Sequence, residues 1–480
     1  MSIINISSRR ELFVDDYLIH STTARLVIQK PQKQEVCFRF DAPFDGTGNY
    51  FPVLIKTGEE FRMYYMASQL TSSDGSKELS GEFPSYCCCI TSRDGVAWAR
   101  PSIGAIEFDG NRDNNIVFTK SKLDNFIPFL DSNPNCGSDA KFKALEGGWG
   151  QLSAYKSSDG YKWSRMFDKP LSITGKFDSN NVAFWDSYRE RYWAYVRSFH
   201  DVPGEDYNAG VRDINVCESS DFQNWSEAVQ LDFEGSADIP LYVSNATPYY
   251  RAPHIFMGFP MRYVEKRDWS PAFDQLSDQA HRRNRMLHDR RYGLAVTDSV
   301  FMTSRDGKKW RRTSEAFLRP GLVADNNWVY GDCLFCIGMQ ETRSDTRGAP
   351  NDLSMYCLEN HWKDFAELRR YTLRIDGFMA LSAGGCGHET VTKPFIFDGS
   401  RMEINVSTSA RGFMKVEMQE ISGERIDGFD FEACDEIFGD RLSYTVTWNG
   451  SSNVAVLSGK PIRMRLFMED ADLFSIQFSA

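Results

Sequence analysis

The chain has 480 residues, more than one hydrophobic core usually serves, so we expect two domains. The composition is that of a globular protein, with 41% hydrophobic and 25% charged residues. No apolar run approaches the roughly 18 residues that a membrane span needs. The formal net charge of -11 argues against nucleic acid and anionic membranes as main partners.

The chain begins MSIINISSRRELFVDDYLI, which has no basic segment followed by an apolar stretch. We therefore expect no secretory signal and a cytoplasmic protein. The 11 cysteines are scattered, and their odd number favours buried free thiols over a disulfide framework. Cys333 and Cys336 have C-x2-C spacing, but no second pair follows, so we interpret them as structural. We expect no cofactor.

A short pattern of the form Ser-x-Asp-Gly-x-x-Trp recurs along the first two thirds of the chain. Its copies are Ser92–Trp98, Ser157–Trp163, Ser219–Trp225, where Phe222 replaces glycine, and Ser304–Trp310. Asp-Gly favours a tight hairpin turn, and a strand-like run precedes each copy. Repeated units of four antiparallel strands, each longer than about 40 residues, are typical of propeller blades.

A fifth unit can be assembled from Leu334–Gln340 and Leu353–Leu358, with Glu11–Ile19 as its closing strand. The sequence therefore predicts an all-β fold that begins with a five-bladed β-propeller over residues 1–367. The alternative is a β-sandwich of repeated hairpins. It is less favoured because sandwich strands rarely carry one turn signature over four copies.

Two regions depart from the blade pattern. Residues 264–292 read as a helical insertion with the basic run His281–Arg285. This run can meet an anionic sugar group, or it can be a solvated helix face or a subunit contact. From residue 368 the turn signature disappears, and alternating segments such as Met402–Thr408 and Ile462–Met468 follow. Their period of two predicts a β-sandwich domain over residues 368–480.

Several segments resemble uncharacterised bacterial proteins that are similar to glycoside hydrolase family 32. They are Glu11–Ile19, Phe177–Asp186, Arg251–Pro260, Gly384–Pro394 and Cys434–Asp440. The resemblance covers essentially the whole chain. It implies a five-bladed propeller of the invertase and arabinanase type, with three carboxylates around the central tunnel that hydrolyse a glycosidic bond.

By this resemblance the candidate catalytic residues are Asp45 as nucleophile or base, Asp131 as stabiliser and Asp178 as acid. Glycosyl transfer needs one carboxylate as base or nucleophile and one carboxylic acid for the leaving oxygen. Leu130 replaces the arginine of the Arg-Asp-Pro motif, and Asp178 stands in place of the glutamate of Glu-Cys. These departures put fructoside specificity in doubt. Each aspartate can instead be a turn or cap residue.

Further polar residues near the expected tunnel entrance are candidate substrate-binding groups. They are Asn125, Asn180, Arg197, Arg212, Asn245, Tyr249, Arg251 and His254. Arginine can bind a uronate or buffer a catalytic aspartate, and it can equally cross-link blades. A lone histidine is usually structural. Asp and Asn oxygens in the tunnel can also hold Ca²⁺.

The sequence thus predicts a glycoside hydrolase acting on a short oligosaccharide or glycan fragment, exo-acting rather than endo-acting. Two alternatives stay open: a polysaccharide lyase on the same scaffold, and a propeller that binds glycans without chemistry. The expected partner is an oligosaccharide, without nucleic acid or membrane, and a homo-oligomer is compatible with the exposed surfaces. The sugar and the stereochemical outcome depend on geometry.

Overall fold

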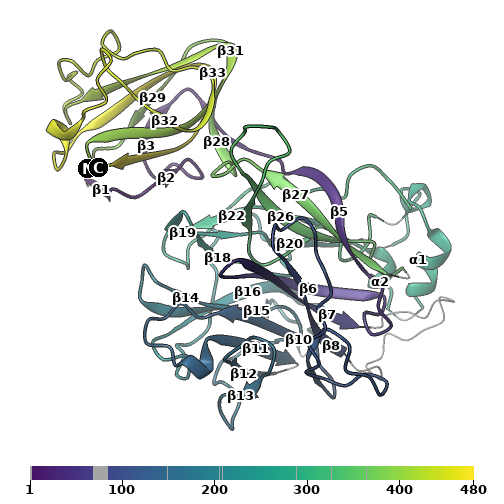
Figure 1. Ribbon diagram of the computed structural model, residues 1–480. Coiled ribbons are helices and arrows are strands. Elements are labelled where there is room, and N and C mark those ends of the chain that lie inside the picture. The colour runs from purple at the N-terminus through teal and green to yellow at the C-terminus, as the bar shows by residue number, and fades with distance from the viewer. Residues whose placement is uncertain are drawn as a thin grey trace.

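The computed structural model describes residues 3–68, 85–148, 150–204, 206–207, 209–266, 268–287, 289–325, 327–363 and 365–480. The regular structure of these residues is almost entirely β-strand, and it forms a propeller with a separate sandwich beside it (Figure 1). None of the helices in this part of the chain has the length and apolar character of a membrane-spanning segment.

The first three blades are antiparallel sheets whose four strands follow one another along the chain. Blade I contains β6 (Gly48–Thr57), β7 (Glu60–Ser68), β8 (Ser85–Ser92) and β9 (Ile116–Lys120). Blade II contains β10 (Asn125–Leu130), β11 (Phe142–Gly148), β12 (Gln151–Ser157) and β13 (Ser164–Arg165), with η1 (Ser138–Ala140) before β11. Blade III contains β14 (Val182–Asp186), β15 (Arg191–His200), β16 (Val211–Ser219) and β17 (Val229–Gln230).

The last two blades complete the ring of five. Blade IV contains β18 (Thr247–Tyr249), β19 (Ala252–Gly258), β22 (Met302–Ser304) and β23 (Arg311–Arg312). Blade V contains β24 (Leu334–Phe335), β25 (Gln340–Thr342), β26 (Asp352–Glu359), β27 (Ala366–Leu373) and β5 (Gln32–Phe40). The five-bladed propeller predicted from the repeats is confirmed.

The closing strand differs from the prediction. β5 pairs with β27 from Phe40 opposite Ala366 to Gln32 opposite Thr372, so Gln32–Phe40 closes the ring instead of Glu11–Ile19 (Figure 1). Pairing between strands about 330 residues apart in sequence leaves no local signal, because it depends on which sheet edge remains open.

The repeated turns explain why the blades recur. In the first copy Ser92 Oγ accepts a hydrogen bond from Gly95 N at 2.9 Å, and Asp94 Oδ1 accepts one from Val96 N at 2.8 Å. Trp98 Nε1 donates to the Gly95 carbonyl at 3.2 Å. The Ser and Asp bonds recur in the other three copies. Gly95 has a φ of 75°, a left-handed conformation that glycine adopts without steric cost.

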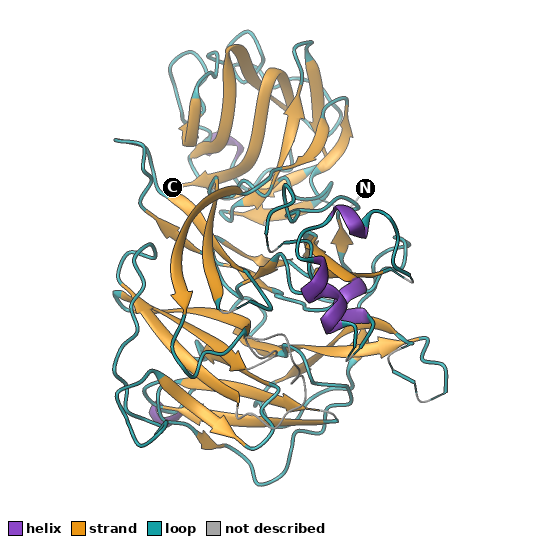
Figure 2. Cartoon of the chain, turned by 90° about the vertical axis from the view of Figure 1, so that its right-hand side faces the viewer, coloured by secondary structure: helices purple, strands orange, loops and turns teal. Residues whose placement is uncertain are grey.

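The helical insertion expected near 264–292 corresponds to the segment between two strands, of which residues 267 and 288 lie outside the described part. It follows β20 (Met261–Glu265) and precedes β21 (Ala295–Ser299), and it contains η2 (Phe273–Gln275), α1 (Gln279–Arg285) and α2 (Arg291–Leu294) (Figure 2). Arg282 and Arg285 are buried, so the basic run is not simply a solvated helix face.

The sandwich takes strands from both ends of the chain. From the first residues come β1 (Ile4–Ser7), β2 (Glu11–Leu12), β3 (Ile19–Thr22) and β4 (Arg25–Ile28). They pair with strands of the C-terminal part, which contains β28 (Met379–Ala383), β29 (His388–Thr392), β30 (Phe395–Phe397), β31 (Arg401–Gln419), β32 (Asp440–Thr445), η3 (Ala455–Leu457) and β33 (Arg463–Ser479). The structure therefore differs from the predicted boundaries of 1–367 and 368–480. The propeller strands span residues 32–373, and the sandwich strands span 4–28 and 379–479.

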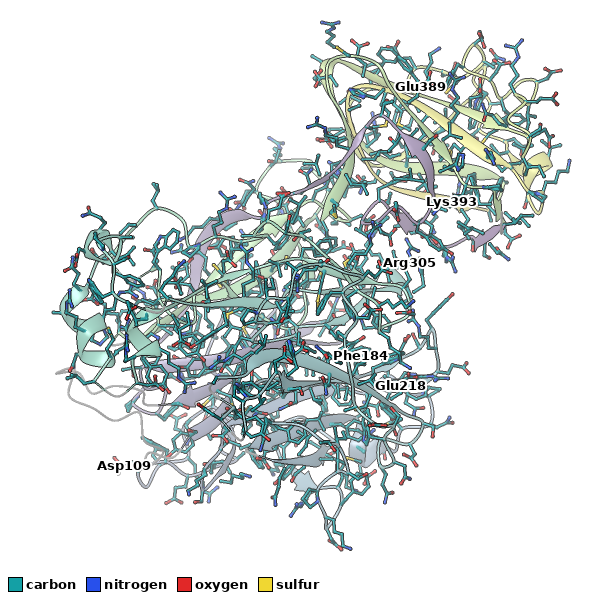
Figure 3. All side chains as sticks on the ribbon, turned by 180° about the vertical axis from the view of Figure 1, so that it is seen from behind. Asp109, Phe184, Glu218, Arg305, Glu389 and Lys393 are labelled. Carbon is teal, nitrogen blue, oxygen red and sulfur yellow. The ribbon has the colours of Figure 1, made fainter. Side chains whose placement is uncertain are left out.

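Buried ion pairs join the two domains. Glu11 is fully buried and accepts hydrogen bonds from Arg9 Nε at 2.7 Å and from Arg305 Nη1 at 2.9 Å. Arg305 lies at the junction in Figure 3, where it also bonds Asp15. Lys393 lies on the sandwich side of the same junction. These contacts hold the N-terminal strands against blade IV.

Candidate active site

The innermost strands surround a central tunnel. A cavity of about 380 Å³ lies between them, lined by Val53–Lys56, Ile127–Leu130, Val182–Phe184, Thr247–Tyr250 and Ile337–Met339. The bridge between Val53 and Ile337 is parallel, as expected when every blade starts at the centre in the same direction. Residues that precede these strands therefore gather at one end of the tunnel, the upstream mouth. Residues that follow them gather at the downstream mouth.

Asparagines link the blades just upstream of the cavity. Asn180 Nδ2 donates to Asn245 Oδ1 at 2.6 Å, and Asn245 Nδ2 donates to the Phe335 carbonyl at 2.6 Å. Asn181 Nδ2 donates to Asn125 Oδ1 at 3.3 Å. The structure thus places the predicted residues Asn125, Asn180 and Asn245 at the same mouth, where their side chains connect blades II to V.

Two buried amide oxygens near this mouth, Oδ1 of Asn49 and Oδ1 of Asn180, have no hydrogen-bond donor among the described residues. A buried acceptor left unpaired costs about 1–3 kcal/mol, so each is suited to a ligand hydroxyl or a cation. Amide oxygens are also ligands of Ca²⁺, and a calcium ion here stays a prediction.

Three carboxylates lie near one another on blades II and III. Asp124 directly precedes Asn125, Glu146 is on β11, and Asp178 lies shortly before β14. Asp124 is open to solvent, yet partial burial of its carboxyl raises its pKa, and the negative charges of Asp178 and Glu146 raise it further. Lys120 opposes this shift while its Nζ lies 2.6 Å from Glu146 Oε1. Asp124 therefore keeps its proton to a higher pH than an ordinary aspartate does.

Asp178 is held as an ion pair. Arg197 Nη1 donates to Asp178 Oδ1, and the Arg197 backbone N–H donates to Asn181 Oδ1 at 3.2 Å. The structure therefore brings together the predicted Asp178 and Arg197. The site thus combines an aspartate positioned by an arginine with Asp124, a carboxyl whose pKa is raised.

Aromatic side chains form one wall of the upstream mouth. The Arg197 guanidinium carbon lies 4.6 Å from the centre of the Phe199 ring and 5.3 Å from that of Tyr242. Tyr242 lies 5.6 Å from Tyr330, and burial raises the pKa of Tyr330 well above its ordinary value. Flat rings of this kind pack against the apolar faces of sugars.

Asp45 has a structural environment. Its carboxylate is fully buried and accepts hydrogen bonds from Tyr65 Oη at 2.7 Å, from Ala42 N at 2.9 Å and from Arg100. Burial raises its pKa, although these three donors oppose the shift. Asp45 thus holds the loop between β5 and β6, and both of its oxygens are engaged.

Asp131 follows β10, so it lies toward the downstream mouth, away from Asp178. Its Oδ2 accepts hydrogen bonds from Lys143 and from Tyr192 Oη at 2.7 Å, and its Oδ1 accepts one from Asn133 N at 2.9 Å. Because a strand rises about 3.3 Å per residue, β10 separates the two aspartates along the tunnel. Asp131 links blade II to blade III.

Three predicted substrate-binding residues lie toward the downstream mouth, at the junction of the two domains. Tyr249 Oη donates to Asp376 Oδ1 at 2.7 Å, and Arg251 Nε donates to the same oxygen at 2.9 Å. His254 Nε2 lies 3.2 Å from Glu11 Oε1. These groups contact the residues that join propeller and sandwich, and not the carboxylates of the upstream mouth.

Sequence reasoning missed Asp124 and Glu146. Asp124 had a usable signal, because it directly precedes Asn125 at the start of an inner strand. Glu146 had none, because it lies within β11, opposite Phe126. Only the folding of blade I beside blade II brings Lys120 to Glu146.

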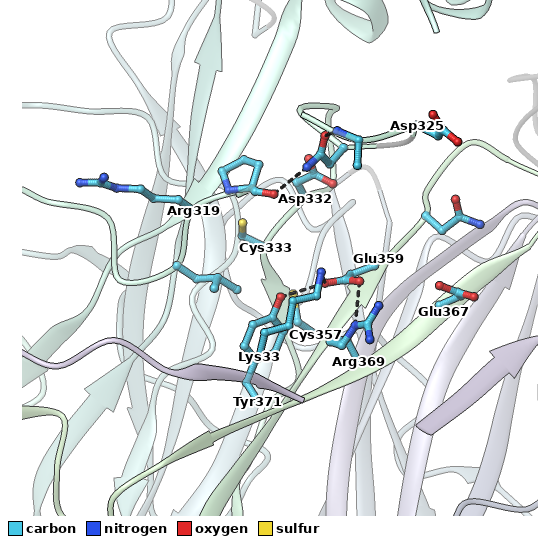
Figure 4. Close-up of a pocket in the computed structure, with 15 residues that line it drawn as sticks. Lys33, Arg319, Asp325, Asp332, Cys333, Cys357, Glu359, Glu367, Arg369 and Tyr371 are labelled. Atoms are coloured by element: carbon cyan, nitrogen blue, oxygen red, sulfur yellow. Dashed lines mark hydrogen bonds and ion pairs between the residues drawn. The ribbon is translucent and has the colours of Figure 1, made fainter. Parts of the chain in front are cut away.

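A second pocket, of about 240 Å³, lies between blades IV and V (Figure 4). Its central carboxylate, Glu359, is engaged by Lys33 at 2.9 Å, Arg369 at 2.9 Å and Tyr371 at 2.8 Å. Burial raises the pKa of Asp332 to about 7, and its Oδ2 accepts a hydrogen bond from Val329 N at 3.0 Å. Because the carboxylate of Glu359 is already bound by three partners, it is not free to act as a base beside Asp332.

One group of potential metal ligands stands out among the described residues, His200 with Asp201 and Asp238. Both ring nitrogens of His200 already contact carboxylates, Nδ1 with Asp213 at 2.9 Å and Nε2 with Asp238 at 3.0 Å. These contacts explain the cluster without a metal.

Comparison with known proteins gives no family and only distant structural likeness. No protein-family model and no curated protein matches the chain. Among solved structures, a glycoside hydrolase matches at 11% identity, covering 72% of this chain and 92% of its own, with a TM-score of 0.44. An N-acetylgalactosamine deacetylase from F. plautii matches at 13% identity, covering 73% and 96%, with a TM-score of 0.43.

A family 32 β-fructofuranosidase from Bombyx mori covers 94% of this chain and 95% of its own at 8% identity, with a TM-score of 0.40. The resemblance stated from sequence thus has counterparts among glycoside hydrolase structures. At these identities and TM-scores, any functional conclusion must come from the side chains of the upstream mouth.

Proposed function

We propose that the protein is a glycoside hydrolase whose active site is the upstream mouth of the propeller. The observation that supports this is that two carboxyl groups of the mouth have different surroundings. Asp124 has a raised pKa beside Asp178 and Glu146, while Asp178 is bound by Arg197. One acid that keeps its proton and one carboxylate are the two groups that glycosidic cleavage requires.

In the proposed reaction Asp124 donates its proton to the glycosidic oxygen as the bond to the anomeric carbon breaks. Asp178 then acts in one of two ways. It accepts a proton from a water that attacks the anomeric carbon, or it attacks that carbon itself and forms an ester, which a water activated by the deprotonated Asp124 hydrolyses. Arg197 keeps Asp178 in place. This assignment differs from the sequence-based one, in which Asp178 was the acid.

The same geometry makes a lyase less suitable. A lyase on this scaffold would need a tyrosine or histidine as base, and burial raises the pKa of both Tyr50 and Tyr330 well above the ordinary value. These tyrosines therefore stay neutral near neutral pH, which makes them poor bases.

We also propose exo-action and a cytoplasmic location. Tyr292 of the insertion lies 5.3 Å from Trp362 and 6.2 Å from Tyr330, so the insertion adds to one side of the mouth and favours binding of a chain end. All 11 cysteines are free thiols, which suits a reducing compartment. Release of single sugars from the start of a reaction, and not of mixed fragments, is the expected sign of exo-action.

The test is product analysis by mass spectrometry in ¹⁸O-water over a broad oligosaccharide panel, with wild type, Asp124→Asn and Asp178→Asn. We expect one ¹⁸O atom in the wild-type product and a loss of turnover of at least about a hundredfold in each variant. Asp109→Asn is the matched control, because Asp109 is exposed on the edge of the propeller and its left-handed φ of 49° suits asparagine (Figure 3). An unsaturated, unlabelled product would identify a lyase, and full activity of Asp124→Asn would refute the assignment of the acid.

A further inference from the structure

Arg212 is a buried arginine that has no carboxylate partner among the residues that the structure describes. It lies on β16 and is 5% exposed. Its guanidinium carbon lies 3.9 Å from the centre of the Tyr263 ring and 5.9 Å from that of Phe199. Within the described part of the chain, no carboxylate or carbonyl accepts a hydrogen bond from its side chain, and its buried Nε is unpaired. Leaving a buried cation unpaired is costly, so the site is suited to an anion from outside the protein.

Two other positive charges at the upstream mouth have acidic partners. Lys120 is paired with Glu146 at 2.6 Å, and Arg197 is paired with Asp178. Asp213, the sequence neighbour of Arg212, points to the other face of the strand and bonds His200 at 2.9 Å. Among the described residues, no carboxylate forms an ion pair with Arg212.

Arg212 is also close to the proposed catalytic group. Phe199 lies between the two arginines, 4.6 Å from the Arg197 guanidinium carbon and 5.9 Å from that of Arg212. Tyr263, on which Arg212 stacks, lies 6.2 Å from Tyr242, which contacts Arg197. A sugar that reaches Asp178 along this aromatic wall has Arg212 beside it.

We propose that the substrate is an acidic sugar whose anionic group binds Arg212. The planar guanidinium, held in place by stacking on Tyr263, can form two parallel hydrogen bonds to a carboxylate, as in a uronic acid. A sulfate ester offers the same charge and acceptors. This proposal takes its reaction from the proposed function, but the binding of an anion by Arg212 does not depend on catalysis.

The test measures binding without turnover. Asp124→Asn protein is titrated calorimetrically with oligouronides, with the same oligosaccharides after reduction of their carboxyl groups to alcohols, and with sulfated counterparts of the reduced set. We expect at least one acidic oligosaccharide to bind about tenfold or more tightly than its reduced form, because hydrogen bonds to charged groups are the stronger ones. The uronide and sulfate arms show which anion is preferred.

Arg212→Gln, added to Asp124→Asn, is expected to remove the preference, and Arg212→Lys to retain part of it. Arg262→Gln is the matched control, since Arg262 precedes Tyr263 and is bound to Asp298 at 2.7 Å. Thermal unfolding of each variant verifies that it is folded. The proposal is overturned if no acidic sugar binds more tightly than its reduced form, or if folded Arg212→Gln protein keeps the preference. An acidic preference without hydrolysis by wild type would instead refute the proposed function alone.

Discussion

Carboxyl groups with the same chemistry have different tasks in this protein because their neighbours differ. Asp45 and Asp131 have their oxygens bonded to buried donors of the scaffold, which ties them to structural positions. Asp124 has no such donors among the described residues and instead has two acidic neighbours, so its proton is retained to higher pH. The surroundings of a carboxyl, and not its type, indicate whether it is available for chemistry.

The pH dependence of hydrolysis follows from the state of Asp124. A general acid must be protonated, so activity should fall as the pH rises through the pKa of Asp124. Lys120 lowers this pKa, and removing its charge in Lys120→Met should raise the pKa and move the alkaline limb of kcat/KM to higher pH. The pH–rate profile measures this shift.

Lys122→Met is the control for this measurement, because Lys122 is exposed and is not among the charges that shift the pKa of Asp124. An unchanged limb in Lys120→Met, or a limb moved to lower pH, would contradict the role of Asp124 as acid.

At the level of elements, the Asp-Gly turn does more than reverse the chain. In three blades the carbonyl of the turn glycine accepts a hydrogen bond from a tyrosine of the preceding blade. The pairs are Tyr356 with Gly95, Tyr64 with Gly160 and Tyr195 with Gly307. In blade III Phe222 occupies the glycine position, and its ring packs 5.6 Å from Phe129 and 5.1 Å from Tyr192. Each turn thus fastens one blade to the next.

Gly307→Ala should be strongly destabilising. A Cβ at this position would lie 2.6 Å from Trp193, and the φ of 80° is strained for alanine. We expect a loss of about 2–4 kcal/mol in the free energy of unfolding, from the left-handed backbone and the overpacking together. Urea unfolding followed by tryptophan fluorescence measures it.

Gly58→Ala separates the two causes. Gly58 has a similar φ of 60°, but nothing lies within 4 Å of its added Cβ, so only the backbone cost of about 1–2 kcal/mol remains. If both variants lost the same amount, the contact with Trp193 would have no energetic weight.

At the scale of the whole molecule, strands from the beginning of the chain complete both domains. β5 completes the propeller, while β2, β3 and β4 complete the sandwich, so both domains need the first residues and residues far along the sequence. The junction is then secured by buried ion pairs at Glu11 and at Asp376, where Ser475 Oγ also donates at 3.2 Å. Folding of the two domains should therefore be coupled.

The junction should make stability depend on pH. Burial opposes the charged form of Glu11, but His254, Arg305 and Arg9 more than offset it and lower its pKa from the ordinary 4.5 to about 2. A lowered pKa stabilises the fold above the unfolded value, and this contribution is lost as the pH falls from about 4.5 to about 2. The shift corresponds to about 3 kcal/mol.

Glu11→Gln should therefore be less stable than wild type at pH 7, and the difference in unfolding free energy should shrink as the pH falls toward 2. Denaturant unfolding at several pH values measures it, with Glu424→Gln as control because Glu424 is an exposed loop residue of the sandwich. A difference that stays constant with pH would argue against the Glu11 ion pairs.

What the sequence determined by itself is local. The Ser, Asp and Gly of each turn bond within five residues, so the pattern predicted the turns, the blades and their number. The period-two strands predicted the sandwich. The position of Asp178 and Asn180 before an inner strand predicted part of the upstream mouth, because residues preceding inner strands converge on the tunnel axis.

The tertiary structure alone decided the contacts between distant segments. It selected Gln32–Phe40 as the closing strand, took Asp45 out of reach by surrounding it with Tyr65 and Arg100, and brought Lys120 to Glu146. It also left Arg212 without a carboxylate partner in the described part of the chain. The physical reason is that burial, ion pairing and pKa depend on neighbours far away in sequence, whereas turns and strand periodicity depend on neighbours a few residues away.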